Sequence, residues 1–271
     1  MNGDIMNLKK VFITGAGSGL GKEAAIALAR RGHTVYASVH YASQIASLRE
    51  LALQESLDLH VFHLDVLDSE DRKQILDYDI DVFISNAAIG DSGSVAEVDI
   101  NRIINVFNTN IFGNLHCIQL ALKNMITIKK SGRIVILTSL AGRIPAPFLS
   151  PYCASKFALE AFTTCLRQEM RLLKDSHIEV CAIEPGAYAT GFNKENNEKK
   201  YPWMEEKSYF HDILHLLRYY EEKIWNFIEI KPFDSIIRLY VKTVEAKHVR
   251  HRYTAPWYQS LLIQLGRILG M

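Results

Sequence analysis

The chain has 271 residues, and its 31 Lys plus Arg against 30 Asp plus Glu give a formal net charge of +1. This near balance argues against nucleic acid as a partner, because a phosphate-binding surface usually carries a clear basic excess. Hydrophobic residues make up 48% and charged residues 23% of the chain, proportions that exclude general disorder. The four cysteines form no CxxC pair, and the sequence shows neither a secretory leader at residues 1–4 nor an apolar window of about 18 residues. We therefore expect reduced thiols and a cytoplasmic protein.

Up to about residue 185, short apolar runs alternate with patterns of helical period. Strand patterns occur, in chain order, at residues 11–13, 34–39, 59–64, 82–84, 134–137 and 180–183. Helical patterns occur at residues 23–30, 44–53 and 151–173. Strands that alternate with helices indicate βαβ units. The predicted fold class is α/β, a single domain over residues 1–271 with a Rossmann-type, doubly wound parallel sheet whose strands all end at one edge.

Two segments depart from this alternation. Residues 187–233 contain a polar run at 193–200 and then many aromatic residues. We predict a helical insertion here that forms a lid over an apolar substrate, since aromatic side chains supply large contact areas. A helical hairpin whose aromatic residues simply pack on the core is an equally open alternative. The tail at residues 255–271 is apolar and helix-like, and we expect it to dock on the protein's own core or on a partner subunit, with membrane contact less favoured.

A glycine-rich turn lies between the first strand pattern and the first helical pattern. Its glycines are Gly15, Gly17, Gly19 and Gly21. Glycine permits a tight turn and a close approach of the backbone to a pyrophosphate, and the free N–H groups of a helix start attract that charge. The strand–turn–helix context therefore predicts a site for the phosphates of a dinucleotide.

Tyr152 and Lys156 lie four residues apart in a helical pattern, so both side chains face the same side. A nearby ammonium favours the phenolate and lowers the pKa of a tyrosine, which is ordinarily about 10. Tyr152 is therefore a candidate general acid/base. Ser139 follows the fifth strand and lies at the same edge, where its hydroxyl can hold a substrate oxygen or form a turn beside Gly142.

Two further polar residues leave alternatives open. Asp65, at the end of the third strand, can accept a hydrogen bond from an adenine amino group, or it can cap the helix that begins after Asp68. Asn110 falls inside a helical pattern, where asparagine is mildly unfavourable. A buried amide at that position can bond the backbone or hold a chain of waters.

Together these residues resemble the short-chain dehydrogenase/reductase superfamily in its shorter, non-extended branch. The matching motifs occur in the order typical of the family: Thr14-Gly15-x-x-x-Gly19-x-Gly21, Asn86-Ala87-Ala88, Asn110 with Gly113, Ser139, Tyr152-x-x-x-Lys156 and Pro185-Gly186-x-x-x-Thr190. They cover about residues 8–192. Residues 151–162 resemble the retinol and 17β-hydroxysteroid dehydrogenases of this superfamily.

The resemblance implies a role for each motif. Tyr152 would exchange a proton with the substrate oxygen, and Ser139 would orient the carbonyl. Lys156 would bind the nicotinamide ribose and lower the pKa of the tyrosine, while Asn110 would hold a water that links Lys156 to solvent. The implied cofactor contacts are Gly15, Gly17, Ser18, Gly19, Leu20, Gly21, Asp65, Val66, Asn86, Ala87, Pro185, Gly186 and Thr190, together with Tyr152 and Lys156.

The choice between the two nicotinamide cofactors depends on the second strand. NAD-selective members carry an acid near its end that bonds the ribose 2′-hydroxyl, whereas the segment 35–40 has none here. Ser38 and His40 can bond a 2′-phosphate instead, which favours NADP over NAD. No metal is expected, because the family needs none and His211 and His215 lack the neighbouring Glu of a zinc-protease motif.

The resemblance therefore implies an NAD(P)-dependent oxidoreductase that interconverts a lipophilic alcohol, steroid- or retinoid-like, and its carbonyl. A 3-oxoacyl or small-carbonyl reductase is one alternative, and a non-catalytic nucleotide-binding regulator on the same fold is another. Family members commonly pair the helices around residues 101–129 and 151–175 across a subunit interface, which implies a homodimer or homotetramer.

Overall fold

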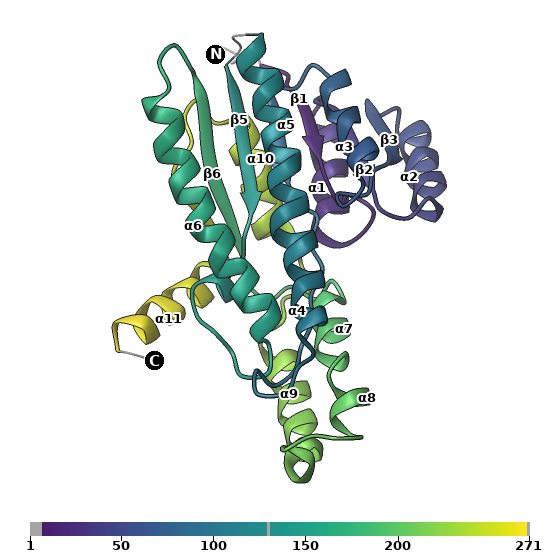
Figure 1. The fold of residues 1–271 in the computed structure, drawn as a ribbon. Helices are drawn as coiled ribbons and strands as arrows, with labels where there is room; N and C mark the ends of the chain where they lie inside the picture. Colours follow the sequence, from purple (N-terminus) through teal and green to yellow (C-terminus); the bar gives the residue numbers. More distant parts are fainter. Residues whose placement is uncertain (1–6, 129–130, 270–271) are drawn as a thin grey trace.

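A seven-stranded parallel sheet forms the centre of the protein, here a computed structural model that describes residues 7–128 and 131–269 (Figure 1). The strand order is β3-β2-β1-β4-β5-β6-β7. The strands are β1 (Lys10–Ile13), β2 (Thr34–Val39), β3 (Leu59–His63), β4 (Val82–Ser85), β5 (Gly132–Leu137), β6 (Ile178–Pro185) and β7 (Arg252–Ala255). The predicted α/β, doubly wound sheet in a single domain is thereby confirmed. The expected absence of a leader at residues 1–4 and the last two residues of the predicted tail lie outside the described residues.

Helices cover both faces of the sheet. They are α1 (Gly19–Arg30), α2 (Ser43–Gln54), α3 (Ser69–Lys73), α4 (Ile100–Phe107), α5 (Asn114–Thr127), α6 (Ser150–Leu172), α7 (Phe192–Glu198), α8 (Tyr201–Met204), α9 (Leu214–Ile228), α10 (Asp234–Glu245) and α11 (Trp257–Ile268). In Figure 1, α5 and α6 lie in front of the sheet and α10 lies behind it. A π-helical segment, Asn108–Gly113, joins α4 to α5.

The residues of β1 show why the sheet is buried on both sides. Val11 and Ile13 belong to the apolar core beneath α1 and α10, whereas Phe12 between them belongs to the core beneath α5 and α6. All three side chains are fully buried. Successive residues of a strand point to opposite faces, so a continuous apolar run is what a sheet covered on both faces requires.

β7 and α10 have no counterpart among the predicted elements. The four residues of β7 include Arg252 and Thr254, so they lack the apolar run that marks the other strands. Pairing with β6 nevertheless places β7 in the sheet, with Ile183 beside Tyr253 and Glu184 beside Thr254. Tertiary pairing therefore determines this edge strand more than its composition does.

The segment predicted as a lid forms α7, α8 and α9, which lie beyond the carboxyl ends of β5 and β6 (Figure 1). It has a small core of its own, made by Tyr201, Met204 and Leu214, with Phe148 and Trp203 packed against it. Part of the aromatic content thus packs internally, as the hairpin alternative expects. Other aromatic residues are exposed: Tyr209, Tyr219, Tyr220 and Phe227.

The tail forms the predicted helix, α11, which projects from the body of the protein (Figure 1). Most of the large apolar side chains of α11 and of Leu269 directly after it are exposed: Trp257, Tyr258, Leu261, Leu262, Leu265, Ile268 and Leu269. This apolar side therefore does not dock on the protein's own core, and docking on a partner subunit, the other expected arrangement, stays a prediction. Within residues 7–128 and 131–269, none of the helices has the length and apolarity needed to cross a bilayer.

Candidate active site

The glycine turn lies where the strand order reverses, between β1 and β4, and close packing explains its composition. A Cβ atom on Gly15 would lie 2.7 Å from the Cα of Ala87, and one on Gly21 would lie 2.5 Å from the carbonyl oxygen of Gly15. Gly15 and Gly19 also have φ values of +66° and +54°, which favour glycine. A Cβ on Gly17 would meet the side chain of Gln44 at the start of α2.

The start of α1 is suited to bind an anion. Ser18 is its N-cap residue, and the N–H of Lys22 makes the first bond back to the Ser18 carbonyl at 3.2 Å. In the described part of the chain, no side chain caps this end and the first turn has no acid. The N–H groups of residues 19–21, which include Leu20, therefore remain available to a phosphate. These features fit the pyrophosphate of a dinucleotide.

Asn86 and Thr14 hold this turn against the end of β4. The amide nitrogen of Asn86 donates to the carbonyls of Thr14 (2.8 Å) and Gly15 (3.0 Å), and its oxygen accepts from the Tyr240 hydroxyl (2.9 Å). The Thr14 hydroxyl oxygen accepts from the N–H groups of Asn86 and Ala87 at 3.0 and 3.1 Å. The Asn86 side chain thus shapes the turn, and half-buried Ala87 packs on Gly15.

Of the two residues expected to select the cofactor at the corner where β2 ends, Ser38 and His40, only His40 is accessible. Ser38 is fully buried, and its hydroxyl donates to the Ile13 carbonyl at 3.4 Å. Its placement therefore gives no support to a contact with a 2′-phosphate. His40 is exposed, and its Nδ1 lies 3.9 Å from Oδ1 of Asp65. An acid thus reaches this corner from β3 rather than from β2.

Asp65 is not the cap of the following helix. Asp68 caps α3, accepting from the N–H groups of Glu70 and Asp71, whereas Asp65 accepts from the N–H of Leu67 at 2.9 Å. The Asp65 carboxylate is only partly buried and so remains accessible beside His40. The carbonyl of the next residue, Val66, would lie 2.8 Å from a Cβ on Gly113, so the π-helical segment packs closely here.

Tyr152 lies in the first turn of α6 and touches two segments from distant parts of the chain. Its hydroxyl lies near the side chain of Ser139, which follows β5 and favours the phenolate. Its ring meets the ring of Phe192 edge to face, with centroids 5.5 Å apart. Burial raises the pKa of Tyr152, and the nearby Ser139 side chain opposes that rise only in part. The pKa of Tyr152 is therefore raised, whereas the sequence predicts that Lys156 lowers it.

Lys156 is 2% exposed and lies one helical turn further along α6. Its ammonium donates to the Leu137 carbonyl at 2.9 Å and lies 5.6 Å from the centre of the Tyr152 ring. Burial lowers the pKa of Lys156 to about 8, while the Glu160 carboxylate opposes that change. The side chain therefore changes charge close to physiological pH, with a neutral carbonyl as its hydrogen-bond partner.

Asn110 bonds the backbone, the first of its two predicted alternatives. Its amide nitrogen donates to the Ile89 carbonyl (2.8 Å) and the Ser155 hydroxyl (3.0 Å), and its oxygen accepts from the Ile89 N–H (2.8 Å). Ser155 in turn donates to the Tyr152 carbonyl at 2.7 Å. Asn110 therefore ties the loop after β4 to the turn of α6 that carries Tyr152.

The segment that begins at the end of β6, residues 185–192, packs beside Ser139, the glycine turn and Tyr152. The Ser139 hydroxyl lies 3.5 Å from the Pro185 carbonyl. The side chain of Thr190 lies beside Gly19, where an added Cβ would be 3.6 Å from its own Cβ. The N–H of Gly186 donates to the Ala255 carbonyl of β7 at 2.8 Å, and the N–H of Ala187 donates to Oε1 of Gln259 on α11 at 2.9 Å, so both elements support this segment. Residues 185–192 thus run from the glycine turn to Tyr152.

Three residues near this arrangement are missing from the predicted set. Phe192 follows the Pro-Gly-x-x-x-Thr motif directly, so its position at the start of the lid was a usable signal. Glu160 lies four residues after Lys156 and therefore on the same helix face. Glu184 directly follows the apolar run 180–183 of β6, and a buried acid in such a position is costly unless it is paired.

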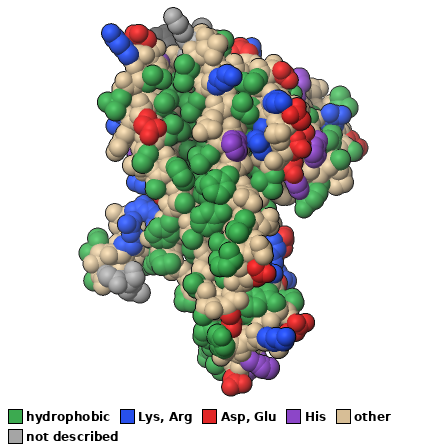
Figure 2. All heavy atoms as spheres, in the orientation of Figure 1, with side chains coloured by type: hydrophobic (Ala, Val, Ile, Leu, Met, Phe, Trp, Pro, Cys, Tyr) green, Lys and Arg blue, Asp and Glu red, His purple; other side chains and the backbone are tan. Residues whose placement is uncertain are grey.

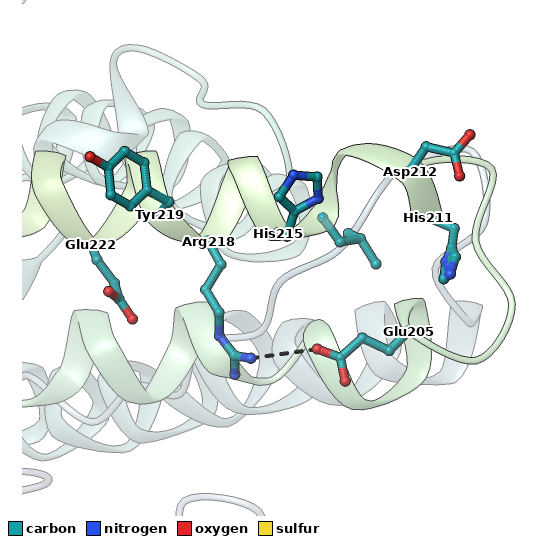
Figure 3. Close-up of a pocket in the computed structure, with 8 residues that line it drawn as sticks. Glu205, His211, Asp212, His215, Arg218, Tyr219 and Glu222 are labelled. Carbon is teal, nitrogen blue, oxygen red and sulfur yellow. Dashed lines mark hydrogen bonds and ion pairs between the residues drawn. The ribbon is translucent and has the colours of Figure 1, made fainter.

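A separate surface cavity of about 570 Å³ lies between α8 and α9 (Figure 3). Its lining is mostly charged and polar: Glu205, His211, Asp212, Leu214, His215, Arg218, Tyr219 and Glu222. None of the residues that we place in the candidate active site lines this cavity. His211 and His215 lie on different elements, a short 3₁₀ turn and α9. Among the described residues, no group of three or more His, Cys, Asp or Glu side chains is placed to hold a metal.

Comparisons with known proteins agree with this geometry. The family model described as short chain dehydrogenase matches residues 9–201. A probable short-chain type dehydrogenase/reductase of Helicobacter pylori is 36% identical over 197 residues, which cover 69% of each chain. Estradiol 17-beta-dehydrogenase 1 of Rattus norvegicus is 28% identical over 260 residues, or 92% of this chain and 74% of the rat protein.

Among solved structures, a short chain dehydrogenase/reductase from Burkholderia phymatum, in complex with NAD, superposes with a TM-score of 0.80. It is 19% identical in sequence, and the match covers 97% of this chain and 94% of that protein. A likeness at this identity shows the shared fold. The match of the family model over residues 9–201 shows more: the chain is an oxidoreductase that belongs to the short-chain dehydrogenase/reductase family.

Proposed function

We propose that the protein interconverts a lipophilic alcohol and its carbonyl with a nicotinamide dinucleotide, with Tyr152 as the acid/base. One observation carries the proposal: the Tyr152 hydroxyl lies close enough to Ser139 for that side chain to affect its pKa, its ring meets Phe192, and buried Lys156 follows one helical turn later. A phenol, a hydroxyl and an ammonium thus gather at the carboxyl edge of the sheet, where ligands of open α/β sheets bind.

The residues at this edge suit a nicotinamide dinucleotide. The turn at residues 15–21 and the start of α1 would hold its phosphates. Ala87 and Thr190 lie beside that turn, whereas Asp65 lies beside His40 and Val66 beside Gly113. Lys156 would bond the ribose. When bound, the nicotinamide supplies or accepts the hydride. NADP remains our preferred cofactor, with His40 as the residue that meets the 2′-phosphate.

The protonation states favour proton donation by Tyr152. Because burial raises the pKa of Tyr152, the phenol keeps its proton at neutral pH and can donate it from Oη to a carbonyl oxygen. The Ser139 hydroxyl lies near the Tyr152 phenol and can orient the substrate carbonyl beside it. The Lys156 ammonium, 5.6 Å from the ring centre, stabilises the phenolate left behind.

A lipophilic substrate fits the surroundings of Tyr152. Phe192 covers one side of the phenol ring. The connection from Ser139 to α6 is largely apolar, Ile144-Pro145-Ala146-Pro147-Phe148-Leu149, and Phe148 packs into the small core of α8 and α9. Estradiol 17-beta-dehydrogenase, whose name specifies a steroid, aligns over most of this chain. We therefore favour a steroid- or retinoid-like alcohol, with α7–α9 as the lid over it.

We also propose that the protein is a homodimer or homotetramer. Apolar side chains are exposed on α4, on α6 and on the π-helical segment between α4 and α5: Ile100, Ile104, Phe112, Phe157 and Phe162. The view that has α5 and α6 in front shows green side chains along the middle of the molecule (Figure 2). A patch of this kind is typical of a protein–protein contact. Light scattering at micromolar concentration tests it, and a monomer would overturn it.

The decisive experiment separates cofactor binding from turnover. The purified protein is titrated with NADPH and NADH by fluorescence, and then assayed with estrone and all-trans-retinaldehyde. We expect tighter binding of NADPH and reduction of at least one carbonyl. Tyr152→Phe should bind the cofactor as the wild type does and lose about 10²–10⁴-fold in kcat. Retained turnover in Tyr152→Phe contradicts the proposed chemistry, and binding of neither cofactor favours the non-catalytic alternative.

A further inference from the structure

Behind Lys156 lies a buried cluster of two carboxylates and two guanidinium groups. Glu184, at the end of β6, is fully buried, and Glu160 on α6 is 8% exposed. Arg252 of β7 and Arg143, just after the turn that carries Ser139, approach them. The four side chains come from four different segments, so only the folded protein assembles the cluster.

Arg252 holds the two carboxylates close to each other. Its Nε lies 2.9 Å from Oε2 of Glu160 and 2.8 Å from Oε1 of Glu184. Because both carboxylate oxygens lie beside the same nitrogen, they cannot be farther apart than the sum of those two distances. Arg143 approaches Glu184 from another direction, with Nη1 3.4 Å from Oε2. Two like charges at such a separation repel each other unless one of them is neutralised.

Two oxygens of the cluster have unused hydrogen-bonding capacity. Oε1 of Glu160 and Oε1 of Glu184 are both buried and accept no hydrogen bond from any described residue, although Oε1 of Glu184 makes the 2.8 Å ion-pair contact with Arg252. A proton shared by the carboxylate pair would satisfy such oxygens. Burial and the neighbouring Glu160 raise the pKa of Glu184 to about 7, against the effect of both arginines. The pair therefore gains or loses a proton near neutrality.

The cluster is coupled to Lys156 through α6 and the turn after Ser139. Glu160 is one helical turn beyond Lys156, and its charge favours the ammonium. A Cβ on Gly142 would lie 2.8 Å from the Lys156 carbonyl oxygen and 3.3 Å from Cγ of Glu160. The turn at residues 140–142 thus packs directly on this part of the helix, between Ser139 and Arg143.

We propose that Glu160 and Glu184, held by Arg252 and Arg143, act as positioning residues that stabilise the charged form of Lys156 in the reaction proposed above. When both carboxylates are ionised, they offset the burial of the ammonium; when one takes up a proton, that support weakens. The inference depends on the proposed function only for the role of Lys156 in the reaction, since the electrostatic coupling itself is a property of the folded chain. His251, directly before β7, is a further titratable side chain that interacts with Glu160.

The test uses two neutral variants of nearly unchanged shape, Glu184→Gln and Glu160→Gln. Glu179→Gln is the matched control, because Glu179 is also on β6 and also ion-paired, with Arg133 at 2.6 Å, but lies at the opposite end of the strand. The ¹⁵Nζ signal of Lys156, identified by its loss in Lys156→Arg, is followed against pH in each protein. This measurement requires no substrate.

We expect both cluster variants to move the Lys156 titration to lower pH, while Glu179→Gln leaves it in place. In assays with estrone or all-trans-retinaldehyde, kcat of Glu184→Gln should fall about 3- to 10-fold at pH 8 and much less at pH 6, with little change in KM. A Lys156 titration unchanged in both variants, or shifted equally in the control, overturns the proposal. If the protein reduces neither probe, the proposed function fails while the NMR titration still decides the coupling. If Glu184→Gln does not fold, Glu160→Gln carries the same test.

Discussion

The protein buries one lysine at the edge of its sheet and another in its lid, and the two are held in different ways. Lys156 donates to a backbone carbonyl at 2.9 Å. Lys200, which is also fully buried, lies 2.8 Å from the Glu221 carboxylate and bonds the Asn197 side chain at 3.0 Å. Burial lowers the pKa of both lysines, but Glu221 directly opposes the effect on Lys200. A paired ammonium serves as a structural link, whereas an ammonium with a neutral partner is ready to change charge.

The same difference extends to the surroundings of each lysine. Glu221 also accepts from the Tyr201 hydroxyl at 2.6 Å, so the lid forms around one satisfied ion pair. The nearest carboxylate to Lys156 along its helix, Glu160, is occupied by Arg252. Chemistry is thus expected where charge compensation is incomplete, and stability where it is complete.

Replacing each lysine by methionine should separate the two roles most strongly. Lys156→Met should lose at least about 10²-fold in kcat, yet lose only about 1 kcal/mol of unfolding free energy, since its lost partner is one carbonyl. Lys200→Met should lose about 3 kcal/mol or more of unfolding free energy, because Glu221 remains partly buried without its cation. Denaturant unfolding and steady-state kinetics measure both. Equal destabilisation by the two variants would contradict the comparison.

The pH dependence of reduction should follow Lys156. Its folded-state pKa is lowered to about 8, whereas that of Tyr152 is raised, so only the lysine loses its proton as pH rises through about 8. We expect kcat/KM for carbonyl reduction to decline over that range. Lys156→Arg, which keeps its charge at these pH values, should be less active but should show no such decline. A wild-type rate that is flat from pH 7 to 9 would exclude Lys156 as the titrating group.

Phe192→Ala tests the contact between the lid and the site. Removing the ring takes away the edge-to-face contact with Tyr152 and apolar surface beside the substrate. We expect KM for estrone or retinaldehyde to rise about 3- to 10-fold, with the affinity for NADPH unchanged. Tyr209→Ala is the control, because Tyr209 is an exposed lid aromatic. Equal effects of the two substitutions on KM would show that Phe192 does not contact the substrate.

The smallest expected effect concerns stability. The pKa of Glu184 is raised in the folded state from an ordinary value of 4.5 to about 7, so the folded protein holds a proton that the unfolded chain releases. Its contribution to stability is complete below about pH 4.5 and is lost as pH rises through about 7. Glu184→Gln should therefore flatten the fall in unfolding free energy over this interval. A slope identical to that of the wild type would show that Glu184 does not titrate there.

Much of the site was predictable from spacing. The positions of Gly15, Gly19 and Gly21 indicate a turn that approaches a phosphate, and the spacing of Tyr152 and Lys156 places them on one helix face. Other features depend on packing between distant segments. The hydroxyl of Ser38 points into the sheet rather than toward the cofactor corner, and the acid there, Asp65, comes from a neighbouring strand.

The sequence by itself determined the strand–helix alternation, the glycine turn and the set of polar residues at the strand ends, because apolar periodicity and motif spacing are local properties of the chain. Only the tertiary structure decided the edge strand β7, the outward apolar side of α11 and the burial of Lys156 behind Tyr152. It also assembled the cluster of Glu160, Glu184, Arg143 and Arg252. Burial and long-range ion pairing set protonation, and both depend on neighbours that lie far away in the chain.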